Sequence, residues 1–226
     1  MALQWILFDL DNTLLDFDGA ADQALSDTLT ELDLDGQKDL KFSYHQINHQ
    51  CWSRFERGEI DIPTLKKQRF ELFVSENHLN VDAELMNRKY LDRLSEQVIE
   101  IDGARNLLDQ SRKHFKLVLV TNGFAEVQHP RIERSGFRSY FQHIVISEEI
   151  GANKPASAFF DHTFDLMAKP EKDEVMIIGD SLSSDIKGGY DYGIRTCWYN
   201  PKKQQNQTDI RPDYTIQALE ELPNHW

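Results

Sequence analysis

The chain has 226 residues, of which 40% are hydrophobic and 28% are charged, a composition typical of a folded globular protein. Its formal net charge of -13 argues against a broad surface for polymeric nucleic acid, because phosphate backbones need clustered Lys and Arg. No apolar run approaches the roughly 18 residues of a membrane-spanning helix, and no basic region precedes the first apolar stretch, so we expect neither a membrane partner nor a secretory signal. Cys51 and Cys197 are too few for a disulfide framework, and we expect a cytoplasmic location.

Short apolar runs alternate with helical patterns along most of the chain. The first run covers residues 3–9 and ends in Asp9. The later runs cover residues 115–121, 143–147, 175–180, 194–199 and, as a short sixth, 214–216. Helical spacing of apolar residues predicts helices at 103–113, 125–135, 156–168 and 183–192. This alternation predicts a Rossmann-like α/β core, a parallel sheet with helices on both faces.

Residues 17–96 contain no strand-like run. Apolar residues recur there at helical spacing, Pro63 suits the first turn of a helix, and Gly58 is typical of a helix end. We therefore predict a four-helix unit, the cap, at residues 17–96, inserted after the first strand. The core then comprises residues 1–16 and 97–226.

Polar side chains follow each of the first four strands. Asp9 and Asp11 follow the first strand, Thr121 follows the second, Lys154 follows the third and Asp180 follows the fourth. Ligands of open parallel sheets bind outside the carboxyl ends of the strands. The sequence therefore predicts that these side chains converge on one rim and form a site for a small ligand.

These motifs resemble the haloacid-dehalogenase-like phosphohydrolase superfamily, in its helical-cap subclass. The four ordered motifs are Asp9-Leu-Asp-Asn-Thr13, Thr121-Asn-Gly123, Lys154-Pro155 and Gly179-Asp-Ser-Leu-Ser-Ser-Asp185. The resemblance covers essentially the whole chain, since residues 17–96 fit the inserted cap. One departure is Asn12, where the family usually has Gly; Asn also tolerates left-handed backbone geometry.

The resemblance implies phosphoryl transfer through a covalent aspartyl phosphate. Asp9 is then the nucleophile, and Asp11 is the general acid that protonates the leaving oxygen and later the base that activates water. The Thr121 hydroxyl and the Asn122 backbone N–H are expected to hold a phosphate oxygen. Lys154 is expected to neutralise the phosphoryl group.

The same resemblance implies a magnesium site. Its expected ligands are the Asp9 carboxylate, the backbone carbonyl of Asp11 and the Asp180 carboxylate, and oxygen ligands are those that Mg²⁺ prefers. Asp185 is expected to orient metal-bound water or Lys154, with Ser181 as another group in that outer position. Mn²⁺ or Co²⁺ would also bind at such a site.

The sequence looks closest to the pyrimidine 5′-nucleotidase branch of the superfamily, which implies a small phosphorylated metabolite, a nucleoside monophosphate, as the partner. The residues that carry this likeness are Thr121-Asn-Gly-Phe124, Ile146-Ser-Glu-Glu-Ile-Gly151 and Cys197-Trp198. Phosphoglycolate and sugar-phosphate phosphatases share much of this pattern and remain the alternative. A 2-haloacid dehalogenase leaves Asp11, Asp180 and Asp185 unexplained. A non-catalytic receiver-like module is disfavoured because it has no inserted helical unit.

Two segments leave more than one interpretation open. Trp52, Phe55 and Arg57 in the cap are candidates for substrate selection, with an aromatic ring stacking on a base. The alternative is that the two aromatic residues form cap core and the arginine is solvated. In the helix after the second motif, Pro130 predicts either a kink or a delayed helix start near Pro130.

Overall fold

The structure is a computed structural model that describes residues 2–36 and 39–225. Within them, a single sheet of parallel strands has the order β3-β2-β1-β4-β5-β6. The strands are β1 (Trp5–Phe8), β2 (Lys116–Thr121), β3 (His143–Ile146), β4 (Val175–Gly179), β5 (Arg195–Tyr199) and β6 (Tyr214–Ile216). This confirms the predicted α/β class and the six predicted strands.

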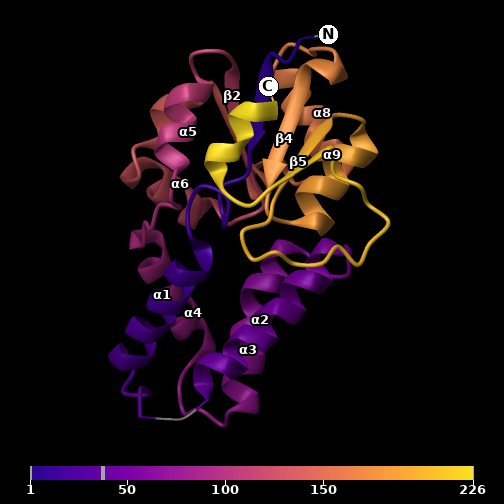
Figure 1. The fold of residues 1–226 in the computed structure, drawn as a ribbon. Helices are drawn as coiled ribbons and strands as arrows, with labels where there is room; N and C mark the ends of the chain where they lie inside the picture. Colours follow the sequence, from indigo (N-terminus) through magenta and orange to yellow (C-terminus); the bar gives the residue numbers. More distant parts are fainter. Residues whose placement is uncertain (1, 37–38, 226) are drawn as a thin grey trace.

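Strand residues alternate between two hydrophobic clusters, one on each face of the sheet. In β1, Ile6 and Phe8 belong to one cluster, whereas Trp5 and Leu7 belong to the other. Each strand therefore reads as a continuous apolar run, because both of its faces are covered. In Figure 1 helices α5 and α6 lie on one side of the sheet and α8 and α9 lie on the other.

The core helices connect successive strands as crossovers. The α-helices are α5 (Ala104–Ser111), α6 (Ala125–Arg134), α7 (Ser147–Ile150), α8 (Ser157–Leu166) and α9 (Lys187–Tyr192). The 3₁₀ helices are η1 (Phe137–Tyr140), η2 (Lys172–Glu174) and η4 (Leu219–His225), and a π-helical turn, η3 (Leu182–Ile186), precedes α9.

The described part of residues 17–96 forms four helices around a hydrophobic cluster of their own. They are α1 (Phe17–Glu31), α2 (Leu40–Glu56), α3 (Ile62–Glu76) and α4 (Ala83–Glu96). Asp16, Asp61 and Asp82 cap α1, α3 and α4 by accepting hydrogen bonds from backbone N–H groups in the first turn. Figure 1 shows the four helices together at one end of the sheet.

The two chain crossings between the cap and the core lie side by side. The Asp16 N–H donates to the Ile99 carbonyl at 2.8 Å, and the Ile101 N–H donates to the Leu14 carbonyl at 3.0 Å. The cap is therefore attached through one short antiparallel pair of segments. One residue of each crossing, Asp16 and Glu100, lines a hollow together with Asp180 at the rim of the sheet.

One local expectation is corrected. Helix α6 begins at Ala125 and contains Pro130, so the alternative of a helix start delayed to Pro130 is wrong. No helix in the described ranges is long and apolar enough to cross a membrane.

Candidate active site

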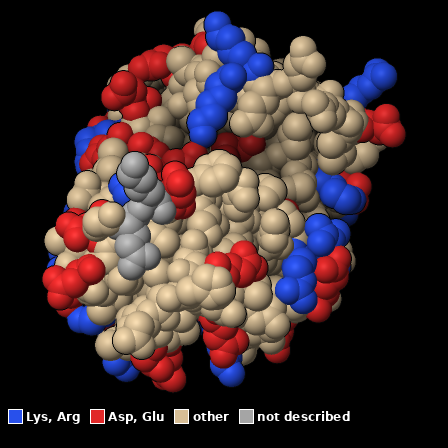
Figure 2. Space-filling view, turned by 90° about the horizontal axis from the view of Figure 1, so that it is seen from below, with Lys and Arg blue, Asp and Glu red and all other residues tan. Residues whose placement is uncertain are grey.

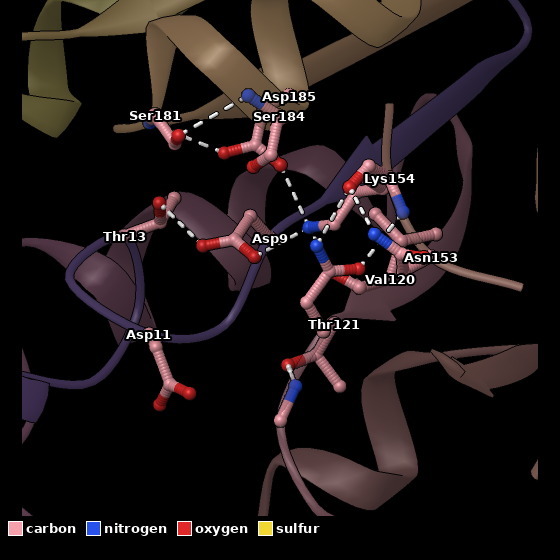
Figure 3. A network of polar contacts seen from close by, with 12 residues as sticks. Asp9, Asp11, Thr13, Val120, Thr121, Asn153, Lys154, Ser181, Ser184 and Asp185 are labelled. Carbon is pink, nitrogen blue, oxygen red and sulfur yellow. Dashed lines mark hydrogen bonds and ion pairs between the residues drawn. The ribbon is translucent and has the colours of Figure 1, made fainter. Parts of the chain in front are cut away.

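A buried lysine connects two of the motif aspartates at the rim of the sheet. Lys154 is 1% exposed, and its Nζ lies 2.7 Å from Asp9 Oδ1 and 2.7 Å from Asp185 Oδ1. Its third contact is the carbonyl of Val120 at 2.9 Å. These contacts come from the ends of β1 and β2 and from η3, and Figure 3 shows them converging on the ammonium group. The three donors of the lysine are thereby fixed in place.

Three carboxylates form a group that fits a divalent cation. Asp9, Asp180 and Asp185 each offer an oxygen, and these oxygens lie within 4.8 Å of one another. Burial and the neighbouring carboxylates of Asp9 and Asp185 raise the pKa of Asp180 well above its ordinary value. Lys154 supplies one positive charge against three carboxyl groups, so a hard cation with oxygen ligands would relieve their repulsion. Among the expected ligands, Asp9 and Asp180 are in this group.

The Asp9 carboxyl group is almost fully enclosed. Burial raises its pKa to about 7, with Lys154 opposing the shift and Asp185 adding to it. The Thr13 hydroxyl donates to Asp9 Oδ2 at 3.0 Å. For Lys154, burial alone would lower the pKa, but Asp185 and Asp9 outweigh it and keep the ammonium charged. The two carboxylate oxygens of Asp9 are thus each held by a hydrogen-bond donor.

Asp11 is held apart from this group. In Figure 3 its carboxylate points away from that of Asp9. Arg131 Nη1 donates to Asp11 Oδ1 at 2.5 Å, and Gln128 Nε2 donates to Oδ2 at 2.7 Å. Asn12, the next residue, has a φ of 60°, the left-handed geometry that Asn tolerates. Arg131 and Gln128 were not anticipated from the sequence.

The second motif is organised around Thr121 and Asn122. The Thr121 hydroxyl oxygen accepts hydrogen bonds from Gly123 N–H at 3.2 Å and from Gln128 Nε2 at 2.8 Å. The Asn122 side chain accepts from the Lys154 N–H and donates to the Lys154 carbonyl, both at 2.9 Å. Asn122 therefore fixes the backbone from which the lysine extends.

Ser181 and Asp185 organise the turn after β4. The Ser181 N–H donates to Asp185 Oδ2 at 3.2 Å, while the Ser181 hydroxyl oxygen accepts from the Ser184 N–H at 3.2 Å. The other oxygen of Asp185 contacts Lys154. Asp185 is 1% exposed and is oriented at both oxygens. Its side chain also occupies the space where a Cβ on Gly179 would lie.

A cavity of about 590 Å³ lies between the cap and this rim. All seven rim residues Asp9, Asp11, Thr121, Asn122, Lys154, Asp180 and Asp185 line it, together with Ser181. The cap contributes aromatic, amide, imidazole and guanidinium groups: Tyr44, His45, Asn48, His49, Trp52, Arg69 and Tyr90. Figure 2 shows a hollow on this face, with acidic side chains in its depth. The predicted rim residues therefore share one cavity.

Only one of the three cap candidates lines the cavity. Trp52 does, and its ring stacks on Phe124 at a centroid distance of 5.3 Å. Phe55 is 6% exposed and packs in the cap core. The Arg57 side chain is 59% exposed and pairs with Glu59. For these two residues the structure agrees with the alternative interpretation, in which Phe55 forms cap core and Arg57 is solvated.

Several cap residues that were not predicted from the sequence also line the cavity. His45, Asn48 and His49 line the cavity with Trp52, and their spacing of three and four residues places them on one face of α2. That periodicity was the available signal. Arg69 of α3 is 2% exposed, donates to the side-chain oxygens of Asn48 and Asn87, and lies over three aromatic rings.

The model of the family described as haloacid dehalogenase-like hydrolase matches residues 6–199, which include the rim of the sheet and the cap. The chain belongs to this family. The hydrolase is therefore an enzyme, and the resemblance drawn from the four motifs is confirmed.

Relatives of this hydrolase include two pyrimidine 5′-nucleotidases. YjjG of Escherichia coli is 34% identical over 98% of this chain and 97% of its own, and PynA of Streptococcus pneumoniae is 34% identical over 98% and 94%. Among solved structures, the HAD hydrolase YfnB of Bacillus subtilis bound to magnesium is 35% identical and has a TM-score of 0.93. That alignment covers 100% of this chain and 99% of YfnB.

Proposed function

We propose that this hydrolase is a magnesium-dependent phosphatase that removes the 5′-phosphate from pyrimidine nucleoside monophosphates through an aspartyl-phosphate intermediate. The observation that carries the proposal is the buried Asp9 carboxylate, which is fixed by Lys154 and Thr13 and opens into the cavity beneath the cap. The identities to YjjG and PynA support the nucleotide assignment.

Asp9 attacks the phosphorus and forms an acyl phosphate while the bond to the ester oxygen breaks. Because an in-line displacement expels the leaving group opposite the nucleophile, the leaving oxygen lies on the cavity side of the phosphoryl group. Asp11 lines that cavity and gives the leaving oxygen its proton. A water molecule then attacks the phosphorus, Asp11 takes its proton, and the Asp9 carboxylate is released with inorganic phosphate.

The remaining rim residues hold the phosphoryl group. Lys154 lies beside Asp9 and offers a fixed positive charge, and the Thr121 hydroxyl and the Asn122 N–H, which line the same cavity, would donate to a phosphoryl oxygen. Asp9, Asp180 and the backbone carbonyl of Asp11 would hold Mg²⁺, and Asp185 would orient Lys154 and the metal's water. When bound, Mg²⁺ neutralises charge that develops on the phosphoryl oxygens. Mn²⁺ or Co²⁺ would substitute for Mg²⁺ at such a set of oxygen ligands.

The cap side of the cavity suits a nucleobase better than a second anion. Four aromatic residues, Trp52, Phe124, Tyr44 and Tyr90, line it, and Trp52 is the one that is not fully buried, so its ring could stack on a base. Lining carboxylates Asp18, Asp22 and Glu56 would repel the carboxylate of phosphoglycolate. Asn48 and two histidines provide hydrogen-bonding groups for the edges of a base.

The test is phosphate release with Mg²⁺ from a panel of esters. The panel contains uridine, deoxyuridine and thymidine monophosphates, purine monophosphates, phosphoglycolate and several sugar phosphates. We expect the highest kcat/KM for the pyrimidine nucleotides. A higher kcat/KM for phosphoglycolate or a sugar phosphate would overturn the substrate assignment, and release of halide from a 2-haloacid without phosphate release would overturn the phosphatase assignment.

A further inference from the structure

Helix α6 places two buried side chains on the carboxylate of Asp11. Gln128 is 1% exposed and Arg131 is 0% exposed, and they lie one turn apart on the same face of the helix. Each donates to a different oxygen of Asp11, at 2.7 and 2.5 Å. Arg131 Nη1 also donates to Gln128 Oε1 at 3.0 Å, so the three side chains form a closed network. Both Asp11 oxygens are therefore fixed.

The surroundings of this network are built to accommodate it. A Cβ on Gly123 would lie 2.2 Å from Gln128 Nε2, so the missing side chain at Gly123 is what gives the Gln128 amide its path to Asp11. Gln128 also donates to the Thr121 hydroxyl, which joins the network to the second motif. Two of the predicted motifs are thus connected through one amide group.

Arg131 further contacts both crossings between the cap and the core. Its Nε donates to the carbonyl of Gln97, the residue after α4, at 3.3 Å. Its guanidinium lies 5.5 Å from the ring centroid of Phe17, the first residue of α1. A change in the position of the cap at its crossings therefore acts on the same side chain that holds Asp11.

We infer that Gln128 and Arg131 are positioning residues that set the orientation of Asp11 toward the leaving group and connect it to the cap crossings. The inference rests on the proposed function, in which Asp11 protonates the leaving oxygen. Neither residue contacts the phosphoryl group in this role. Their effect is exerted through the direction in which the Asp11 carboxylate faces.

The test uses the dependence of the rate on the leaving group. An alkoxide leaves poorly without a proton, whereas p-nitrophenolate leaves well without one, so loss of the general acid slows alkyl esters selectively. The activity of Asp11→Asn, Arg131→Met and the double variant is measured on uridine monophosphate and on p-nitrophenyl phosphate. Gln128→Met removes one of the two donors with little change in volume, and Arg134→Met, an exposed change on the same helix, is the matched control.

For Asp11→Asn we expect kcat/KM on the alkyl ester to fall by about 10²- to 10⁴-fold, the usual contribution of general acid catalysis, with a much smaller loss of kcat/KM on the aryl ester. The comparison uses kcat/KM because kcat also contains hydrolysis of the aspartyl phosphate, a step common to both esters in which Asp11 is the base. Arg131→Met and Gln128→Met should show the same selectivity in kcat/KM with smaller losses. The double variant should be no slower than Asp11→Asn alone, because residues acting through one group are not additive.

Equal losses on both esters, or additive losses in the double variant, would show that Arg131 supports only the fold and would overturn the inference while the acid role of Asp11 stands. Asp11→Asn without leaving-group selectivity would overturn the acid role and the inference together. Circular dichroism identifies a variant that fails to fold. If Arg131→Met does not fold, Gln128→Met and Arg131→Lys are used in its place. If neither of them loses more activity on the alkyl ester than on the aryl ester, the inference fails.

Discussion

Lys154→Met tests how strongly the site depends on its one buried cation. The ammonium contacts Asp9, Asp185 and the Val120 carbonyl at 2.7 to 2.9 Å, and it is 1% exposed. Methionine fits the same space but leaves these carboxylates, with Asp180 beside them, without a positive neighbour. Removing one partner of a buried ion pair typically destabilises a protein by about 3–5 kcal/mol.

That loss converts to a measurable change in melting temperature. At about 2.1 cal/mol/K per residue, a chain of 226 residues has an unfolding entropy near 0.5 kcal/mol/K, so 3–5 kcal/mol lowers Tm by about 6–10 °C. The measurement is thermal unfolding by circular dichroism at neutral pH without divalent metal. The control is Lys67→Met, an exposed lysine paired with Glu71, where we expect a change below about 1 kcal/mol.

The sign of the pH dependence provides a second check on the same variant. Because the remaining carboxyl groups can bind protons in place of the lost ammonium, the deficit of Lys154→Met should shrink as the pH falls. Adding Mg²⁺ should also restore part of the Tm. A deficit no larger than that of Lys67→Met, or one that does not change with pH, would refute the electrostatic reasoning.

Three further predictions concern the metal, the packing and the cap. The folded-state pKa of Asp9 is raised to about 7 from an ordinary 3.8, so the metal-free protein loses stability as the pH rises between these values. Because Mg²⁺ binds the deprotonated carboxylate, the increase in Tm on adding Mg²⁺ should be larger at pH 8 than at pH 6. An equal increase at the two pH values would contradict this. Gly189→Ala should lower stability by about 1–3 kcal/mol in urea unfolding, because the new Cβ would lie 2.5 Å from Ile177 Cγ2, whereas Gly36→Ala, with open space around it, should not. Trp52→Leu should reduce kcat/KM for uridine monophosphate by about tenfold, the equivalent of a stacking contact of 1.4 kcal/mol, and leave p-nitrophenyl phosphate nearly unchanged. Arg57→Ala, outside the cavity, should change neither, and a similar loss on both esters in Trp52→Leu would make that residue cap core.

The rim of the site was predictable because parallel strands end at one edge of the sheet. Asp9, Thr121 and Asp180 each follow a buried apolar run, so the strand pattern alone brings them together in space. Lys154 required the motif resemblance in addition, since it follows β3 only after a short helix and a turn. The core strands were located to within two residues because each is a continuous apolar run covered on both faces.

The cap and the support of Asp11 were less predictable. One face of α2 packs in the cap core and another lines the cavity. Because both faces carry aromatic residues, their spacing alone could not show that Phe55 packs in the core and Trp52 lines the cavity. Arg131 is separated from Asp11 by 120 residues, and a charged residue in a helix is ordinarily solvated. Only the tertiary packing of α6 against the cap crossings shows that it is buried.

The most direct test of the central claim is phosphate release by Asp9→Asn with Mg²⁺ and uridine monophosphate, compared with the exposed control Asp209→Asn. The substitution preserves the size of the side chain but removes the nucleophilic carboxylate. We predict that Asp9→Asn remains folded by circular dichroism and releases no phosphate above background, while Asp209→Asn keeps the normal rate. A folded Asp9→Asn protein that turns over at a near-normal rate would contradict the assignment of Asp9 as the nucleophile.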